Sequence, residues 1–532
     1  MKKYFFILFS LNIFCQNIDV GNPFFYNELN QNQIDSIFSY NILPINVNYI
    51  NSQSLLFNYR LKKITNQNSN IIIKLFPIEN STEFNSNFPY KSNNGIMLPN
   101  VGLQNVFSTG FFLKYGKISL KIKPEFHFME NRFFEEFSKN HFPVIWERRY
   151  RLWNNIDMPV RFGNKSISNI SIGQSNIFLE LKNINIGFSN ENLWWGPSRY
   201  NSIMMSNNSS GFNHFTIQNA KPFDFSFGKI EFKYLSGRLK SSGFNPPNVD
   251  GLSSGTKYYI PKKTRENYSD TSKLNAFIFS ISPNLIEGLS LGIIRWMQFY
   301  KENEFINLDI FSTKFINNPE KKQNKASGYF MRYRGDNIEF YFEYNLNSPS
   351  YKNSIEQVLS YNKKNAHTIG ISKSFKNNFY LNWEWTRMEQ NSNNLINKIG
   401  SWYEHDYIVN GFTHNGEVLG SKIGPGSNSQ TFTLNKSGNK FLASLGFEIV
   451  ENDNDFYHFA FSDSRDYRRY WKDFSLMFNL YKEFNDFNIG IKSIYTRSLN
   501  YTWDLDRNVE PWYHAGFDKN NFYFRLVLNY FL

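Results

Sequence analysis

The sequence predicts an all-β fold, a large antiparallel β-barrel of the outer-membrane type. Apolar and polar residues alternate with a period of two from about residue 106 to the C-terminus, which is typical of barrel strands. No segment has the 18 or more consecutive apolar residues that a transmembrane helix needs. Because only helices and closed barrels satisfy every backbone polar group in lipid, a membrane-spanning form of this chain must be a barrel.

The composition fits one large β architecture. Aromatic residues make up 19% of the 532 residues, a high share for a chain whose mean hydropathy is −0.50. The length alone would allow about three or four domains, but no linker requires a division. The net charge of +13 is compatible with acidic polysaccharide or lipopolysaccharide phosphates as partners, although solvated charge is the simplest interpretation. We expect no nucleic-acid partner for an exported protein.

The N-terminus predicts export. Two lysines precede the apolar stretch Tyr4 to Phe14, which has the length of a secretory signal and is too short to span a bilayer. The only cysteine, Cys15, follows a residue too bulky for lipoprotein processing, so we expect residues 1–15 to be removed as a signal peptide. The exported chain would then contain no cysteine and no disulfide.

Two regions follow the predicted signal peptide. Residues 16–50 are expected to form short helices on the periplasmic side, because Leu29, Ile34 and Phe38 recur at loosely helical spacing. Residues 51–532 are expected to form the transmembrane barrel with long extracellular loops.

The clearest predicted hairpin lies between Tyr329 and Tyr344. A two-residue turn at Gly335-Asp336 would pair Tyr333 with Ile338 and would keep the apolar residues of both strands on one face. That face would meet lipid, and the charged face would line the lumen. The lumen-facing residues predicted here are Arg332, Arg334, Glu339 and Glu343.

A second hairpin follows the same pattern. Lys376-Asn377-Asn378 would form a three-residue turn, since Asn tolerates a left-handed conformation. The returning strand would turn Trp383 and Trp385 outward and the carboxyl group of Glu384 into the lumen. The final strand also alternates and resembles the C-terminal recognition signal of outer-membrane barrels, apart from ending on Leu532.

Long polar stretches between the hairpins are expected to be extracellular loops. Bacterial barrels place short turns in the periplasm and long loops outside. The stretches are Lys240 to Lys273, Lys301 to Lys325, Glu389 to Gln430 and Ser498 to Asn521. Disordered insertion is the alternative, most plausible for the first stretch with its Pro246-Pro247 pair.

The most informative segment for function is ENLWWGPSRYNSIMMSNN, from Glu191 to Asn208. Indole faces stack on the C–H faces of sugar rings, while amide, guanidinium and hydroxyl groups hydrogen-bond to sugar hydroxyls. The segment predicts polysaccharide contacts by Trp194, Trp195, Arg199, Asn201, Asn207 and Asn208. The alternative is a folding motif, in which the paired tryptophans only pack against the Gly-Pro turn.

Two other clusters are similar in kind. Ser401 to Gln430 ends near the turn Gly424-Pro425-Gly426, and Tyr150 to Gly163 reads YRLWNNIDMPVRFG. The first adds three candidate polysaccharide-binding residues: Trp402, Tyr403 and His405. These clusters would either form a glycan surface or fold inward to plug the barrel, and the sequence favours neither alternative.

The sequence contains no arrangement of residues that indicates catalysis. The eight histidines are scattered and none has the spacing of a metal site, so we expect no metal and no cofactor. Glu384 is the better candidate for a lumen carboxyl group, but one inward Glu usually tunes electrostatics, whereas glycoside hydrolysis normally needs two carboxyl groups. A serine triad stays open, since its members meet in space and not in sequence.

Six segments follow one another in a fixed order along the chain. They are IDMPVRFG (Ile156 to Gly163), GQSNIFL (Gly173 to Leu179), ENLWWGPSRYNSIMMSNN, GFNHFTIQNAKPF (Gly211 to Phe223), EFKYLSGRLKSSGF (Glu231 to Phe244) and GFTHNGEVLGSKIGPGSNSQ (Gly411 to Gln430). This ordered series resembles the Wzi family of capsule-assembly outer-membrane proteins, in the form found in Bacteroidetes-type bacteria. The similarity extends more diffusely from about Pro89 to the C-terminus.

The resemblance implies a barrel of about eighteen strands with a small helical periplasmic region. It implies a lectin-like, non-enzymatic protein of the bacterial outer membrane that attaches capsular or extracellular polysaccharide to the cell surface. We therefore expect polysaccharide, outer-membrane lipids and lipopolysaccharide as partners of a monomeric barrel. The alternative function is a porin or glycan-conducting channel, which the predicted lumen charges would suit.

Overall fold

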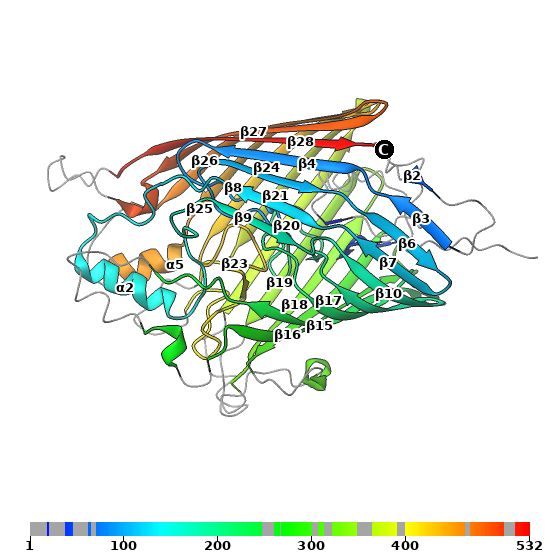
Figure 1. Cartoon of the computed structure of the whole chain (residues 1–532), viewed down its shortest axis with the longest axis horizontal. Coiled ribbons are helices and arrows are strands. Elements are labelled where there is room, and N and C mark those ends of the chain that lie inside the picture. The colour runs from blue at the N-terminus through cyan, green and yellow to red at the C-terminus, as the bar shows by residue number, and fades with distance from the viewer. Residues whose placement is uncertain are drawn as a thin grey trace, which may run out of the picture.

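The computed structural model describes most of the chain as one curved antiparallel sheet (Figure 1). The predicted signal peptide lies outside the described residues, and so does most of the predicted helical region, residues 16–50. The described residues are 19–20, 38–45, 62–64, 71–246, 260–265, 268–300, 307–312, 322–347, 364–390, 400–462, 469–504 and 516–532.

Five of the wall strands are interrupted by breaks of two to four residues and continue beyond them. These runs are β3 (Ile71–Leu75) with β4 (Ile78–Asn85), β5 (Gly102–Ser108) with β6 (Phe111–Tyr115), β7 (Ile118–Ile122) with β8 (Glu125–Met129), β9 (Ile167–Ser171) with β10 (Asn176–Leu181), and β13 (His214–Asn219) with β14 (Phe223–Phe225).

The other wall strands are uninterrupted. They are β11 (Ile184–Ser189), β15 (Gly228–Lys240), β16 (Thr271–Pro283), β17 (Leu289–Phe299), β18 (Asn324–Arg334), β19 (Ile338–Asn347), β20 (Lys364–Phe375), β21 (Phe379–Arg387), β24 (Asn428–Gly438), β25 (Phe441–Glu451), β26 (Lys472–Glu483), β27 (Phe487–Leu499) and β28 (Lys519–Tyr530). Within the described residues, the 24 strands of this sheet thus form eighteen wall-crossing runs plus the two-residue β2 (Lys62–Lys63). The predicted number of about eighteen is confirmed.

The sheet curls until its last strand meets its first. β28 pairs with β4, from Tyr523 opposite Asn85 to Tyr530 opposite Ile78. The ring is not closed along its full height, however. In the described part of the chain β9 pairs with β8 alone, whereas its continuation β10 pairs with both β7 and β11. The wall therefore has a seam beside β9.

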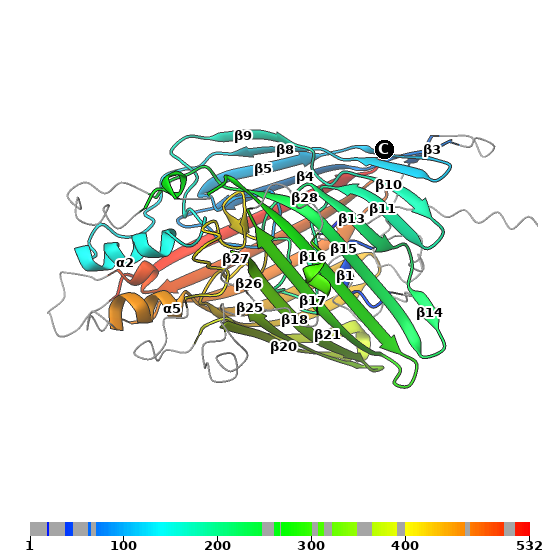
Figure 2. The same ribbon diagram turned by 90° about the horizontal axis from the view of Figure 1, so that it is seen from below.

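The connections differ in length between the two ends of the barrel. Short turns, such as Gly116-Lys117 and Lys376-Asn377-Asn378, lie at the end where the C-terminus is (Figure 1). The described parts of the long connections start from the other end, where α2 (Pro143–Trp153) and α5 (Asn454–Tyr457) lie (Figures 1 and 2). Parts of all four predicted loop stretches lie outside the described residues. By the rule for bacterial barrels we expect this end to face outward, and we name it the extracellular end.

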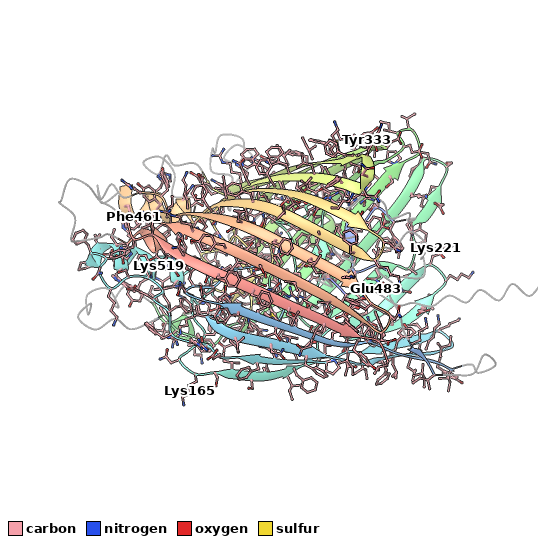
Figure 3. The ribbon with its side chains drawn as sticks, turned by 90° about the horizontal axis from the view of Figure 1, so that it is seen from above. Lys165, Lys221, Tyr333, Phe461, Glu483 and Lys519 are labelled. Carbon is pink, nitrogen blue, oxygen red and sulfur yellow. The ribbon has the colours of Figure 1, made fainter. Side chains whose placement is uncertain are left out.

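The side chains alternate between the two faces of the wall as predicted. On β19, Glu339 and Glu343 are buried inside, whereas Ile338 and Tyr344 are exposed outside. Figure 3 shows the side chains on both faces, with Phe461 and Lys519 at the extracellular end and Lys221 and Glu483 at the opposite end.

One of the two predicted turns is confirmed and the other is wrong in register. Phe375 lies opposite Phe379, and both Asn377 and Asn378 have positive φ, as the three-residue turn requires. In the other hairpin Tyr333 lies opposite Phe340, and not opposite Ile338 as predicted. Gly335 is not among the glycines with positive φ, so the type I′ geometry of a two-residue turn is absent there. The shift of two residues keeps every side chain on its predicted face.

In the part of the chain that the structure describes, helices are few and short. Apart from α2 and α5, this part contains the 3₁₀ turns η3 (Lys262–Thr264), η4 (Leu308–Phe311), η6 (Lys376–Asn378) and η8 (Tyr501–Trp503) and the π-helical turn η7 (His458–Ser462). Within the described ranges, none of the helices has the length and apolar character needed to cross a membrane.

Candidate functional site

Two extracellular connections fold into the barrel and fill it. We call them the plug: residues 190–213, between β11 and β13, and residues 400–427, between β21 and β24. They bind each other, since the backbone N–H of Ser206 donates to the carbonyl of Leu419 at 2.7 Å and the hydroxyl of Tyr403 donates to the carbonyl of Ile203 at 2.8 Å. The plug contains the small strands β12 (Trp194–Trp195), β22 (Thr413–His414) and β23 (Glu417–Val418).

The N-terminal part of the chain contributes to the same interior. Strand β1 (Ile42–Leu43) pairs with β12, so that Ile42 lies opposite Trp195. Trp195 also packs with Met204 and Met205 in an apolar core that joins the plug to inward side chains of β15 through β20, among them Trp296. The interior is therefore a packed core and not an open lumen.

Trp194 and Trp195 are enclosed by this core. Trp194 is 3% exposed and Trp195 is fully buried, so neither indole presents a face on which a sugar would stack. The indole N–H of Trp194 donates to the carbonyl of Ser198 at 2.8 Å, which closes the Gly-Pro turn. Gly196 has φ +103°, and a Cβ there would lie 2.4 Å from Glu343 Oε1. The glycine thus allows the backbone to approach a wall carboxyl group.

Three wall carboxyl groups hold the plug in place. Glu343 accepts the backbone N–H of Ser198 at 2.9 Å and its hydroxyl at 2.6 Å. Glu384 accepts the backbone N–H groups of Arg199 at 2.6 Å and Asn201 at 2.8 Å, as well as that of Tyr200. These are charge-assisted hydrogen bonds when the carboxyl groups are ionised, and such bonds are the stronger kind.

The guanidinium of Arg199 completes the anchor. It donates to Glu339 at 2.7 Å and to Asn382 at 3.0 Å. Arg332 binds the other oxygen of Glu339 at 2.7 Å, and Arg334 lies 3.5 Å from the same carboxyl group. The residues predicted as lumen charges therefore lie in the interior, where they are paired with the plug and with each other.

The amide side chains of the plug bind polypeptide. Asn207 donates to the carbonyl of Asn93 at 2.8 Å, and Asn208 donates to that of Val418 at 3.0 Å. Asn201 donates to the hydroxyl of Ser429 on the wall at 3.0 Å. Their hydrogen-bonding capacity is used for holding the two plug segments and the wall together.

The second predicted cluster lies in the other plug segment. Trp402 and Tyr403 are fully buried. His405 is partly exposed, and its Nδ1 accepts the backbone N–H groups of Tyr407 at 3.2 Å and Ile408 at 3.0 Å. Burial lowers the pKa of His405 to about 3, which keeps the imidazole neutral at physiological pH. Tyr407 is exposed beside it.

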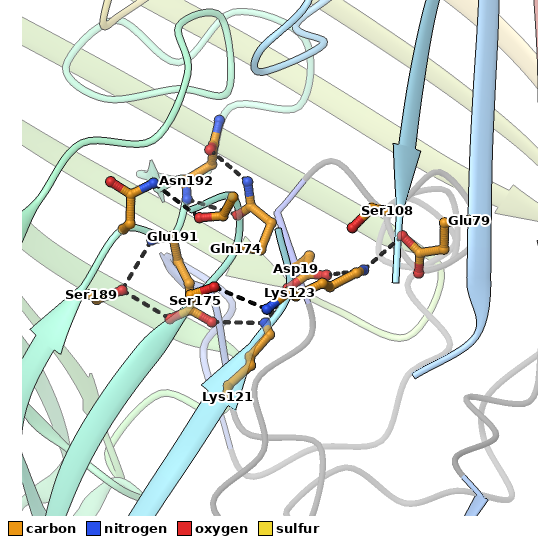
Figure 4. A network of polar contacts seen from close by, with 12 residues as sticks. Asp19, Glu79, Ser108, Lys121, Lys123, Gln174, Ser175, Ser189, Glu191 and Asn192 are labelled. Carbon is orange, nitrogen blue, oxygen red and sulfur yellow. Dashed lines mark hydrogen bonds and ion pairs between the residues drawn. The ribbon is translucent and has the colours of Figure 1, made fainter. Parts of the chain in front are cut away.

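A second anchor, which sequence reasoning missed, lies on the opposite side of the interior (Figure 4). Lys121 and Lys123 of the wall are buried, and both form ion pairs with Asp19, four residues beyond the predicted signal peptide. Lys121 also binds Glu191 of the plug at 2.9 Å, and Lys123 binds Glu79 at 2.6 Å. The sequence contains one indication of this anchor. The two lysines stand two residues apart in an alternating strand, which places both side chains on the same face.

The extracellular end carries an aromatic cap. Helix α2 packs against α5 and η7 through a cluster that includes Trp146, Tyr150, Phe456 and Trp503. The guanidinium of Arg149 lies 5.1 Å from the ring centroids of Trp153 and Phe456 and 3.8 Å from a carboxyl oxygen of Asp453. Aromatic rings and a desolvated cation contribute to packing as well as to charge balance here.

The described residues offer no metal site, since no group of three or more His, Cys, Asp or Glu side chains lies close enough to hold an ion. His214 and His414 each lie in the interior, and burial lowers the pKa of His414 to about 3. The interior therefore supplies fixed hydrogen bonds and packing, which position loops at the extracellular end.

Comparison with known proteins identifies a family. A family model described as "Capsule assembly protein Wzi" matches residues 100–440. Among solved structures, Wzi of Escherichia coli, described as an outer-membrane protein involved in group 1 capsule assembly and a carbohydrate-binding β-barrel, is 13% identical. The match covers 97% of this chain and 100% of that one, with a TM-score of 0.59. At this identity the likeness establishes the fold.

Two further solved structures are more distant. OprD of Pseudomonas aeruginosa is 8% identical, with coverage of 89% of this chain and 97% of that one and a TM-score of 0.40. OpdQ of the same species is 11% identical, with coverage of 86% and 97% and a TM-score of 0.39. No sequence among the curated proteins matches this chain.

Proposed function

The chain belongs to the Wzi family of capsule assembly proteins, and on that premise we propose that it binds capsular or extracellular polysaccharide and anchors it to the cell surface. The carbohydrate binding described for the E. coli protein of the same fold supports the proposal. The filled barrel is the observation that supports this function most strongly. Because the interior is packed and anchored to the wall from both sides, the extracellular end is the surface available for binding polysaccharide.

We assign the predicted sugar contacts an indirect role. Trp194, Trp195, Arg199, Asn201 and Asn207 would serve polysaccharide binding by building the plug and fixing the loops above it. The remaining predicted contacts, Asn208, Trp402 and Tyr403, are equally enclosed, and His405 lies at the boundary with the exposed part of its loop.

We propose further that the protein is not an enzyme. Binding without chemistry needs only complementary surface, and the clusters of polar residues at the extracellular end are paired with one another. Outer-membrane lipids and lipopolysaccharide would surround the apolar outer face as a consequence of the barrel fold. A monomeric barrel and export through residues 1–15 remain part of the proposal.

The proposal is tested by binding. Surface polysaccharide purified from the bacterium that carries the gene should bind saturably to the detergent-purified barrel, and heat-unfolded protein serves as the control. Equal, non-saturable retention by folded and unfolded protein would remove the basis for the proposed function.

A porin or glycan-conducting channel is the alternative function. It requires a continuous aqueous path, and its signature is steady conductance in a planar bilayer. The packing of Trp195 and Trp296 into one interior core favours the anchor instead. Large, steady conductance of the wild-type protein would favour the channel.

A further inference from the structure

A cavity of about 180 Å³ lies at the extracellular end, between the plug and the wall. Plug residues 422–427 form one side, and the extracellular ends of β25, β26 and β27 form the other. Tyr90, Ile423 and Trp471 on its lining are partly exposed. The volume is below the roughly 300–1,000 Å³ of pockets for drug-sized ligands, so the cavity suits a ligand of one ring.

Aromatic side chains supply the flat surfaces of this cavity. The ring centroids of Trp471 and Tyr501 lie 5.2 Å apart. The indole N–H of Trp471 is held by Asp473 at 2.9 Å and by Ser498 at 2.8 Å, which fixes the orientation of the ring. Rigid aromatic rings bind the C–H faces of a pyranose with little loss of side-chain entropy.

Polar groups beside these rings are paired with one another, so the cavity needs no charged ligand to balance its own charges. Glu448 accepts the Tyr90 hydroxyl and the Lys422 ammonium, each at 2.8 Å. The hydroxyls of Ser475 and Thr496 lie 2.8 Å apart on the wall. Such groups retain further donor or acceptor capacity and suit the hydroxyls of a sugar.

A second cavity of about 320 Å³ adjoins the first. Met158, Pro159 and Val160 line both, so this short segment separates them. The second cavity carries Asp157, which pairs with Lys262 at 3.2 Å, and Phe244 at its rim. Two cavities in line fit consecutive residues of a polymer better than a single small molecule.

The cavity is also where two family-like segments meet. Residues 158–160 belong to IDMPVRFG, and Gly424-Pro425 belongs to the segment that ends in GPGSNSQ; both line the first cavity. The Trp-Trp segment is buried in the core, so its position does not explain the role of these two segments.

We propose that the first cavity is a subsite for one sugar ring of the polysaccharide, stacked against the partly exposed Trp471 and recognised through its hydroxyls, and that the chain continues past Met158–Val160 into the second cavity. The proposal rests on the proposed function and adds the place where the polysaccharide is held.

Two glycines allow a matched test. Gly424 has φ +81° and lines the cavity, and a Cβ there would meet no atom within 4 Å. Gly116, in the turn between β6 and β7, has φ +56° and equally open surroundings. Asn tolerates the left-handed backbone conformation, so Gly424→Asn adds a side chain at the cavity with little backbone strain. Gly116→Asn makes the same change at the opposite end of the barrel.

The readout is binding of purified surface polysaccharide to each detergent-purified variant. Gly424→Asn should weaken binding, whereas Gly116→Asn should bind as the wild type does. Trp471→Ala should weaken binding roughly tenfold or more, since truncation of an aromatic anchor has that effect. Trp471→Phe keeps an aromatic ring and should bind more tightly than Trp471→Ala. Raising NaCl from about 0.05 to 0.5 M should change binding little, as recognition through hydroxyls is not screened.

A measurement on the unaltered protein removes dependence on variants that fold poorly. Hydrogen exchange should slow at residues 469–475 and 498–503 when the polysaccharide is added. If the wild type binds without this protection, or if Gly424→Asn and Trp471→Ala bind as tightly as the wild type, the assigned site is overturned while the proposed function stays intact. Absence of any wild-type binding would instead defeat the proposed function.

Discussion

Removal of the Glu384 carboxyl group is expected to release the plug. Glu384 accepts the backbone N–H groups of Arg199, Tyr200 and Asn201 and the hydroxyl of Tyr341, the last at 2.7 Å. In Glu384→Ala these four donors lose their acceptor in an interior where the carboxyl group is 1% exposed. A hydrogen bond to a charged group contributes about 1.5–3 kcal/mol, but neighbouring bonds are not additive.

The expected cost is therefore about 3–5 kcal/mol, the range for breaking a buried charged network by removing one partner. If this energy appears as displacement of the plug, the displaced population rises by about two to three orders of magnitude, since each 1.4 kcal/mol is tenfold. Glu384→Gln keeps one carbonyl acceptor in the same place, and should cost about half as much.

Planar-bilayer conductance measures the displaced plug directly. Glu384→Ala should open steps that the wild type lacks, with Glu384→Gln intermediate. Glu180→Ala is the control, because Glu180 forms its ion pair with Lys114, which lies on the wall and not in the plug. A folded Glu384→Ala barrel that conducts no more than the wild type would refute the assignment of Glu384 as an anchor.

Three further outcomes are expected. Asp19→Asn should speed proteolysis near the N-terminus of the folded protein, since it removes an ion-pair partner from two buried lysines; unchanged cleavage kinetics would speak against this anchor. Trp195→Ala should destabilise the protein by about 3–5 kcal/mol, the cost of a large cavity, as read from denaturant unfolding. Burial raises the pKa of Asp453 to about 6 and that of Glu404 to about 7. The folded loops then bind protons that the unfolded chain releases, so the stability of the loops should fall as pH rises from about 4 to 7. Hydrogen exchange of α5, corrected for intrinsic rates, should therefore be faster at the higher pH.

Local sequence predicted the wall because its determinants are local. Alternation fixes which side chain faces outward, and in the Lys376-Asn377-Asn378 turn the chemistry of asparagine fixes the register as well. At Gly335 the observed register differs from the predicted one by two residues. Alternation could not detect this shift, because it leaves every side chain on the same face, and the turn does not use the left-handed region that would have fixed its position.

The plug could not be placed by the same reasoning. The contact between Arg199 and Glu384 joins residues 185 positions apart, and no periodicity in either segment specifies it. The Trp-Trp segment contains residue types that suit both a sugar-binding surface and a buried turn. The position of Glu343 beside Gly196, which is known only from the structure, favours the buried turn. Trp471 could not be singled out because it lies just before β26, in sequence surroundings no different from those of other aromatic residues of the wall.

The distribution of polysaccharide in cells that lack the gene shows whether this plugged barrel holds polysaccharide at the cell surface. In such cells we expect total synthesis to be unchanged while the cell-bound fraction falls and the released fraction rises, and we expect the intact gene to restore retention. Undiminished retention of polysaccharide on the deletion strain would contradict it.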